Sequence, residues 1–298
     1  MVHPPTIDCH HHLLDLGRNP YPWLQGPSTK THFGDTAALK HDYLIGDYLT
    51  DIKTQNIVKS VHIEAGWDPV DWRGETRWLQ SITDEHGYPH AIVAFVDLLA
   101  PDLRARLDAL ACHPNLRGVR MRFFDPEQLA GGATSTSSLM SEPKWREGFA
   151  LLRDYDLGFD LQAPAGLMAE AADLAAALPD IQLILTHAGL PLDRSDGGME
   201  TWRQGMRLLA GRENVAVKIS GFPMTDWHWT IDSLRPLVLE TIDLFGPARC
   251  MVGSNFPVDK LFSDFDKLFN AYRDITADFS TGEKQNLFHD TAARLYRL

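Results

Sequence analysis

Three consecutive histidines, His10, His11 and His12, lie close to the first residue of a chain of 298 residues. Because successive side chains of a β-strand point to opposite faces, His10 and His12 should share one face, and His11 should lie on the other. Two imidazoles on one face can bind a divalent metal ion or move protons to and from a substrate. A histidine-rich stretch near a terminus can also be a tag remnant or a solvated patch. The apolar residues on both sides of the three histidines favour a strand.

Asp8 lies two residues before His10 in the same predicted strand, so the two side chains should point to the same face. Its carboxylate could then orient an imidazole. Alternatively, Asp8 could be a buried acid that only pairs with Lys218, and the sequence does not distinguish these two roles. A further histidine, His187, follows the apolar residues 183–186. A histidine at the end of a strand can be purely structural, but together with His10 and His12 it completes a set of three imidazoles.

Three neutral imidazoles with an open fourth position match a catalytic zinc site. A metal ion in such a site lowers the pKa of its bound water and polarises a carbonyl group. The predicted cofactor is therefore a divalent metal held by His10, His12 and His187, with zinc as the first choice and no metal as the alternative.

Arg120 and Arg122 alternate on the segment 116–123, so both should face the same side of a strand. A guanidinium group suits a substrate carboxylate or a lactone oxygen, although either arginine could instead pair with a buried acid. Glu64 and Gln162 also follow apolar segments, and Trp227 lies in the aromatic run 227–229. These five residues are the predicted substrate contacts.

Eight apolar segments, each followed by a helical pattern, must position these side chains. The predicted strands are residues 6–12, 57–64, 91–96, 116–123, 157–161, 181–186, 214–220 and 249–253. The predicted helices are residues 47–54, 73–85, 101–111, 145–155, 167–178, 202–211, 231–245, 265–275 and 282–296, and residues 16–40 and 131–141 are predicted loops. This alternation predicts an α/β fold, a single (β/α)8 TIM barrel domain over residues 1–298, with the active site at the C-terminal ends of the strands. A doubly wound sheet would normally carry a glycine-rich turn after its first strand, where this chain has histidines.

Composition restricts the partners. The formal net charge of −12 argues against binding to nucleic acid, which needs a basic surface. The sequence contains no run of 18 apolar residues, so no membrane span is expected. No secretory signal is recognisable, and three widely spaced cysteines argue against a disulfide framework, so we expect a cytoplasmic protein. The expected partner is a small-molecule substrate, and the expected assembly is a monomer or a homodimer.

Several short motifs lie in and just after the predicted strands and at the end of the chain. They are Asp-x-His-x-His at 8–12, Arg-Gly-Val-Arg at 117–120, Thr-His-Ala-Gly-Leu-Pro at 186–191, Val-Lys-Ile-Ser-Gly at 217–221, Gly-Ser-Asn-Phe-Pro-Val-Asp at 253–259, and the closing Leu-Phe and Leu-Tyr pairs at 287–288 and 295–296. Together these motifs resemble those of the amidohydrolase-related proteins. Within that superfamily the chain is most similar to the lactonases that act on sugar lactones and on carboxylated lactones of aromatic breakdown.

The resemblance implies that water attacks a carbonyl group, that His10, His12 and His187 bind a metal or polarise the carbonyl, and that Arg120 anchors the substrate. The lactonase branch does not always require a metal. The family usually has an aspartate general base where this chain has Asn255, and an amide cannot accept that proton.

Three explanations for Asn255 remain open. A zinc-bound hydroxide needs no separate base, or Asp259, Glu64 or a histidine supplies the base, or hydrolysis has been lost. The predicted function is hydrolysis of a carboxylated or sugar-derived lactone, with His10, His12, His187 and Asn255 as catalytic residues. The alternatives are a metal-dependent non-oxidative decarboxylase and a binding barrel without turnover.

Overall fold

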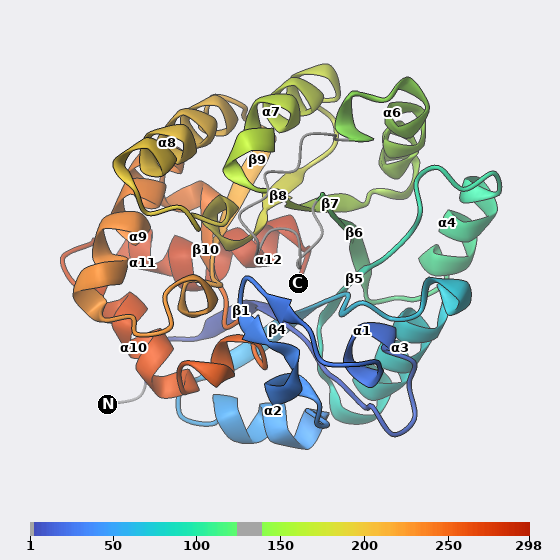
Figure 1. Ribbon diagram of the computed structural model, residues 1–298, viewed down its shortest axis with the longest axis horizontal. Helices are drawn as coiled ribbons and strands as arrows, with labels where there is room; N and C mark the ends of the chain where they lie inside the picture. The colour runs from blue at the N-terminus through green and yellow to red at the C-terminus, as the bar shows by residue number, and fades with distance from the viewer. Residues whose placement is uncertain (1–2, 124–138) are drawn as a thin grey trace.

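The computed structural model describes residues 3–123 and 139–298. Within these ranges, eight parallel strands form one sheet in which each strand pairs with the next one along the chain. The strands are β1 (Thr6–His11), β4 (Ile57–Ile63), β5 (Ala91–Ala94), β6 (Leu116–Arg122), β7 (Gly158–Gln162), β8 (Leu183–Leu185), β9 (Val215–Ile219) and β10 (Cys250–Val252). The strands surround a common centre and the helices form an outer ring, so the predicted (β/α)8 barrel is confirmed (Figure 1).

The barrel is nearly closed by residues that follow β10. The backbone nitrogen of Asn255 donates to the carbonyl oxygen of His10 at 2.7 Å, and that of His12 donates to the carbonyl oxygen of Phe256 at 2.7 Å. An isolated parallel bridge joins His11 to Phe256. The seam between the first and last strands therefore runs through the predicted site residues.

Helices connect successive strands over most of the ring. The longer ones are α2 (Ile45–Ile52), α3 (Gly74–His86), α4 (Leu103–Ala111), α6 (Pro143–Ala150), α7 (Met168–Ala177), α8 (Asp196–Ala210), α9 (Ile231–Phe245) and α10 (Phe265–Ile275). Helix α8 begins six residues before the predicted start at 202. The reason is local, because the side chain of Ser195 accepts a hydrogen bond from the backbone nitrogen of Gly198 and caps the helix.

The predicted loop 16–40 contains short elements of its own: α1 (Pro22–Gln25) and a small antiparallel pair, β2 (Lys30–Thr31) and β3 (Gly34–Asp35). Most of the predicted loop 131–141 lies outside the described residues.

Two apolar layers form the core. The larger layer packs the outer faces of the strands against the helices. The smaller layer fills the barrel and takes alternate strand residues, which are Ile7, Cys9, Val61, Ile63, Ala91, Val93, Ile184, Ala216 and Met251. Ala292 and Tyr296 from the C-terminal segment complete this inner layer.

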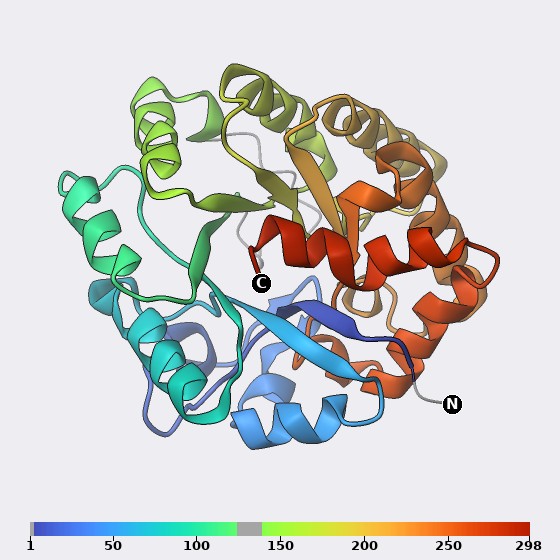
Figure 2. The same cartoon turned by 180° about the vertical axis from the view of Figure 1, so that it is seen from behind.

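The C-terminal segment covers one mouth of the barrel (Figure 2). The predicted helix 282–296 is divided into α11 (Thr281–Gln285), a π-helical turn (Asn286–Asp290) and α12 (Thr291–Leu295). Tyr296, the residue after α12, donates from its hydroxyl group to both carboxylate oxygens of Asp160 at 2.8 and 3.0 Å. This mouth is therefore closed by an aromatic side chain that reaches the barrel interior.

A register shift in β1, between Asp8 and His11, changes which side chains face the barrel. The hydroxyl group of Tyr48 on α2 donates to Asp8, and the ring of His11 stacks on the same tyrosine with 4.0 Å between ring centroids. Residues 8 and 11 would face opposite sides of a regular strand, so the shift acts as a β-bulge. The prediction that Asp8 orients an imidazole is wrong, because the bulge places Asp8 outside the barrel, where Ser254 and Tyr48 bind its carboxylate.

No helix in residues 3–123 and 139–298 is long and apolar enough to cross a membrane. The three cysteines are free thiols. Cys9 on β1 and Cys250 on β10 are buried, and Cys112 at the end of α4 is exposed.

Candidate active site

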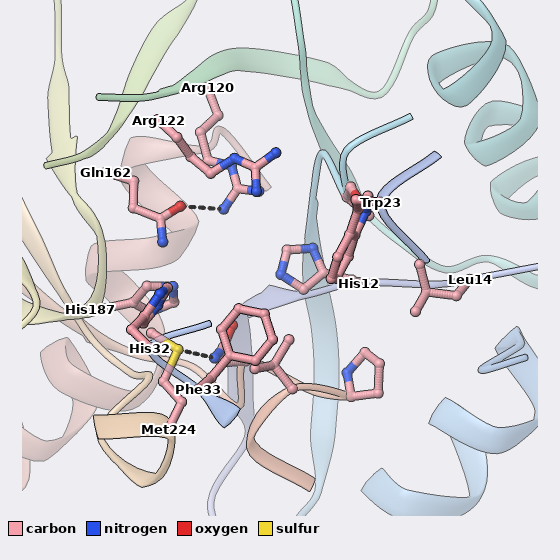
Figure 3. A pocket seen from close by; sticks show the side chains of 14 residues that line it. His12, Leu14, Trp23, His32, Phe33, Arg120, Arg122, Gln162, His187 and Met224 are labelled. Atoms are coloured by element: carbon pink, nitrogen blue, oxygen red, sulfur yellow. Dashed lines mark hydrogen bonds between the residues drawn. The ribbon is translucent and has the colours of Figure 1, made fainter. Parts of the chain in front are cut away.

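A pocket opens where the strands end, and its walls carry several of the predicted site residues (Figure 3). It encloses about 560 Å³, part of which is open to solvent, which is a volume suited to a small molecule. The lining residues are His12, Leu14, Trp23, His32, Phe33, Ala65, Arg120, Arg122, Gln162, His187, Met224, Asn255, Pro257 and Val258.

The structure brings the three predicted imidazoles together. The ring centroid of His10 lies 5.1 Å from that of His12 and 4.5 Å from that of His187. His12 follows β1 directly, and His187 follows β8. His12 and His187 line the pocket, whereas His10 is fully buried beneath them.

The protonation of His12 follows from one hydrogen bond. Its Nδ1 lies 2.7 Å from the carbonyl oxygen of Ile63, which can only accept a hydrogen bond. Nδ1 therefore carries the proton, and Nε2, which points into the pocket, carries a lone pair (Figure 3). Burial, with Arg120 as the next cause, lowers the pKa of His12 to about 3, so the imidazole is neutral at physiological pH.

His187 is held in a backbone conformation that few side chains adopt. Its φ of 55° is in the left-handed region. Its Nδ1 lies 2.9 Å from the hydroxyl oxygen of Ser220, just after β9. A Cβ atom at Gly221 would lie 2.5 Å from that Nδ1, so only glycine allows the backbone to pass this close to the ring. Strained backbone of this kind often occurs at functional sites.

His10 contacts Lys218, which the sequence analysis considered only as a partner of Asp8; the structure pairs this lysine with Asp160 instead. Nζ of Lys218 on β9 lies 3.5 Å from Nδ1 of His10 and 2.7 Å from a carboxylate oxygen of Asp160. Lys218 and Asp160 are both buried inside the barrel. Nε2 of His10 is buried and has no hydrogen-bond partner among the described residues. Burial and then the charge of Lys218 hold the pKa of His10 well below its usual range.

These contacts test whether the three imidazoles fit a metal ion. A metal on Nε2 of His10 requires the proton on Nδ1, but Nδ1 faces an ammonium group that only donates. In the described part of the chain, no group of three or more His, Cys, Asp or Glu side chains is arranged to hold a metal ion. As arranged, the donor set does not fit a metal centre, and we derive no chemical step through a metal.

Arg120 was predicted either to face the substrate or to pair with a buried acid. The structure shows both features, because Arg120 lines the pocket and pairs with Glu64. Its Nε donates to Oε1 of Glu64 at 2.8 Å, and Nη2 donates to the backbone oxygen of Glu64. Its Nη1 donates to Oε1 of Gln162 at 3.1 Å (Figure 3). Arg120 and Arg122 overcome the effect of burial and lower the pKa of Glu64 to about 2.

Glu64 was predicted to contact the substrate, but its carboxylate already binds Arg120 and the backbone nitrogen of Gly66. It lines a neighbouring hollow instead of the pocket itself. Arg122 is paired more weakly, because its Nε lies 4.0 Å from Glu64 and 35% of its side chain is exposed. Arg122 lines both cavities.

Asn255 lines the pocket and has a φ of 55°. Its Nδ2 donates to Oδ1 of Asp259 at 3.1 Å and contacts the sulfur of Met224 at 3.5 Å. Asp259 is fully buried and does not line the pocket, and burial raises its pKa well above the usual range. Of the alternative bases considered for this chain, Asp259 and Glu64 are therefore engaged elsewhere, and His12 presents a lone pair to the pocket.

Trp227 is not among the residues that line the pocket. It is 49% exposed, stacks on Phe262 and donates from Nε1 to the backbone oxygen of Met224. Trp227 was predicted to contact the substrate, but the structure places it outside this pocket. The sequence analysis missed His32 and Phe33, which the β2–β3 pair brings to the pocket wall. A long loop near the first strand was the only signal for them.

A sequence profile of the amidohydrolase family matches residues 7–298. The chain therefore belongs to the amidohydrolase family, as its motifs predicted.

Two relatives cover nearly the whole chain. The uncharacterized protein y4mH of Sinorhizobium fredii (strain NBRC 101917 / NGR234) is 44% identical over 292 residues, which are 98% of each protein. The L-fucono-1,5-lactonase of Burkholderia multivorans (strain ATCC 17616 / 249) is 27% identical over 304 residues, covering 98% of this chain and 96% of that one. Among solved structures, an amidohydrolase from Burkholderia multivorans with bound zinc aligns with a TM-score of 0.83 and 25% identity, covering 99% of this chain and 100% of the other.

Proposed function

We propose that the protein is a hydrolase that adds water to the carbonyl group of a lactone, and that its substrates carry a carboxylate. The observation that supports this most is a pocket that holds both a neutral imidazole with an inward lone pair, His12, and two guanidinium groups, Arg120 and Arg122. Membership of the amidohydrolase family supports hydrolysis. The similarity to an L-fucono-1,5-lactonase supports a lactone.

The chain can supply each proton that ring opening requires. Nε2 of His12 accepts a proton from water as the water oxygen attacks the carbonyl carbon. Arg120 and His187 stabilise the negative charge that develops on the carbonyl oxygen. The protonated His12 then returns the proton to the ring oxygen as the carbon–oxygen bond breaks. Asn255 cannot accept a proton, so its role is to hold polar groups in place.

Two charges near the pocket favour a carboxylate on the substrate. Arg122 is the less tightly paired arginine and is partly exposed, so it can bind an anion. A bound carboxylate would also offset the charge of Arg120, which contributes to the low pKa of His12, and would make His12 a better base. Because the whole chain has a net charge of −12, an anion needs these local arginines to be held.

A pH-indicator assay over a panel of carboxylated and uncharged sugar lactones tests the proposal. We expect ring opening with proton release, and preference for the carboxylated lactones. Arg122→Met should raise KM for carboxylated lactones at least tenfold and leave KM for uncharged lactones within twofold. Arg77→Met is the matched control, because Arg77 lies on α3 with 70% of its side chain exposed and does not line the pocket.

Three outcomes would contradict the proposal. A preparation that releases no proton from any lactone but shows ligand-induced shifts in melting temperature would be a binding barrel. Loss of ultraviolet absorbance from aromatic acids without lactone hydrolysis would indicate a decarboxylase. Equal KM values for charged and uncharged lactones would remove the carboxylate from the substrate class.

The cofactor is the second part of the proposal. The zinc-bound relative supports a divalent metal, whereas the contact between Lys218 and His10 supports hydrolysis by the side chains alone, and we adopt the latter. Elemental analysis of untagged protein and lactone assays with and without a chelator test this choice. Activity that is lost with the chelator and restored by zinc would overturn it. The cytoplasmic location and the monomeric or dimeric assembly remain predictions.

A further inference from the structure

A column of buried polar groups runs through the barrel from its closed mouth to His10, whose ring lies beside those of the pocket residues His12 and His187. The hydroxyl group of Tyr296 donates to Asp160, Lys218 donates to Asp160 at 2.7 Å, and Nζ of Lys218 lies 3.5 Å from Nδ1 of His10. All four side chains are buried. The strands β1, β7 and β9 and the end of α12 supply one member each.

The charge on Lys218 determines which nitrogen of His10 carries the proton. An ammonium group has three donors and no acceptor, so Nδ1 of His10 must accept. A neutral imidazole with an accepting Nδ1 carries its proton on Nε2. That Nε2 is the buried atom that has no partner in the described ranges, so it is a donor that lacks an acceptor within the protein.

His12 has the opposite arrangement, with the proton on Nδ1 and the lone pair on Nε2. The two rings are 5.1 Å apart and nearly perpendicular. When two such rings lie this close, one water molecule can accept from the Nε2–H group of His10 and donate to the Nε2 lone pair of His12.

We propose that Lys218 is a positioning residue that holds His10 in the Nε2–H tautomer, so that His10 and His12 together bind and orient the attacking water. This inference rests on the proposed lactone hydrolysis. The water accepts a hydrogen bond from Nε2–H of His10 and donates one to Nε2 of His12. The oxygen–carbon bond forms as the proton passes to His12, and His12 gives the proton to the ring oxygen when the ring bond breaks.

Nitrogen NMR of protein labelled with ¹⁵N-histidine measures the tautomer without any substrate. A His10→Gln spectrum identifies the His10 signals among those of the 13 histidines. In the wild type we expect a protonated Nε2 and an unprotonated Nδ1. A protonated Nδ1 in the wild type overturns the proposal, whether or not any variant folds.

The variant Lys218→Met combined with Asp160→Asn removes both charges, so neither is left buried alone. We expect the His10 signals to move toward the Nδ1–H tautomer, and kcat to fall at least tenfold with KM within threefold. Tyr296→Phe removes the hydroxyl group that donates to Asp160 but keeps the Asp160–Lys218 ion pair, so it is the matched control and should retain the wild-type tautomer. Unchanged His10 signals in the double variant would overturn the proposal.

Zinc binding provides a second readout, measured by competition with a coloured chelator. A metal on Nε2 of His10 needs the proton on Nδ1, which the ammonium of Lys218 opposes. The double variant should therefore bind zinc at least tenfold more tightly than the wild type, and equal affinity would count against the role of Lys218. Failure of every lactone in the panel, with the Nε2–H tautomer observed, would reject the proposed substrate while leaving the assignment of the tautomer intact.

Discussion

The histidines near the barrel mouth are the same residue type, but their hydrogen-bond partners give them different chemistry. His12 presents a lone pair because Nδ1 donates to a carbonyl oxygen. His62 is structural, since its Nε2 accepts from the backbone nitrogen of Leu13. His11 packs on Tyr48, away from the pocket. At the scale of single residues, function therefore depends on the partner of the second ring nitrogen.

His187→Asn should lower kcat/KM for lactones by 10²- to 10³-fold. The substitution removes the imidazole beside the carbonyl, and charge-stabilising groups of this kind typically contribute that much. Asparagine tolerates the left-handed backbone at position 187 better than most residues, so the fold should persist. Steady-state kinetics with thermal unfolding checks both points. Unchanged turnover in a folded variant would remove His187 from the mechanism.

Asn255→Asp should change the pH dependence of kcat. It would place a second carboxyl group about 3.1 Å from Oδ1 of Asp259, where Nδ2 of Asn255 lies now. Two buried carboxyl groups this close cannot both ionise, so the pair would share a proton and titrate in two steps. The double variant Asn255→Asp with Asp259→Asn restores one amide and one carboxylate and should remove the extra step. Identical pH profiles for the wild type and the single variant would place position 255 away from the chemistry.

Sequence reasoning found the residues that follow strands but not how each one is bonded. His10, His12, His187, Arg120, Gln162 and Asn255 were predictable because the strands of a parallel barrel all end at one rim. The bulge in β1 was not predictable, and it moved Asp8 outside the barrel. The contacts of Lys218 were equally hidden, because they join strands that are far apart in the chain.

At the scale of elements, an ion pair joins β4 to β6 beside the pocket. Arg120 on β6 holds Glu64, the residue after β4, by its side chain and its backbone. The pKa of Glu64 falls from its usual 4.5 to about 2, so the folded state binds fewer protons than the unfolded state between these values. The ion pair contributes stability that is fully present above pH 4.5 and is lost as the pH falls toward 2.

Denaturant unfolding between pH 2 and pH 5 should therefore show a loss of about 3 kcal/mol that Glu64→Gln removes. Glu75 on α3 is the control with the opposite sign. Burial raises the pKa of Glu75 to about 8. The stability that its protonated carboxyl group contributes is therefore fully present below pH 4.5 and is lost as the pH rises toward 8. Glu75→Gln should flatten only that higher range. A slope below pH 4.5 that is equal in the wild type and in Glu64→Gln would contradict the assignment.

The elements themselves were largely predictable. The strand segments were apolar, and each was followed by a helical pattern, which is typical of a parallel barrel. The start of α8 and the π-helical turn at Asn286–Asp290 were not, because a cap and packing against the barrel set them. The β2–β3 pair is only two residues long on each side, so no periodic pattern could indicate it.

At the scale of the whole molecule, the barrel has one open and one closed mouth. The open mouth holds the pocket, and the segment ending in α12 and Tyr296 covers the other (Figure 2). Tyr296 and Asp160 join this cover to Lys218 and so to His10. The far end of the chain therefore supports the first strand of the site.

Because two of the three thiols are buried beside the seam between β1 and β10, the order in which the thiols react reports when that seam opens. Burial raises the pKa of the Cys9 and Cys250 thiols, and these two residues lie on β1 and β10, the strands that meet where the ladder is interrupted. We expect a thiol-specific dye to label Cys112 at once and to reach the other two together in dilute denaturant, ahead of the loss of the helical circular-dichroism signal. Mass spectrometry of the labelled protein counts the dyes. If Cys9 and Cys250 were labelled only as the circular-dichroism signal is lost, β1 and β10 would separate only on global unfolding.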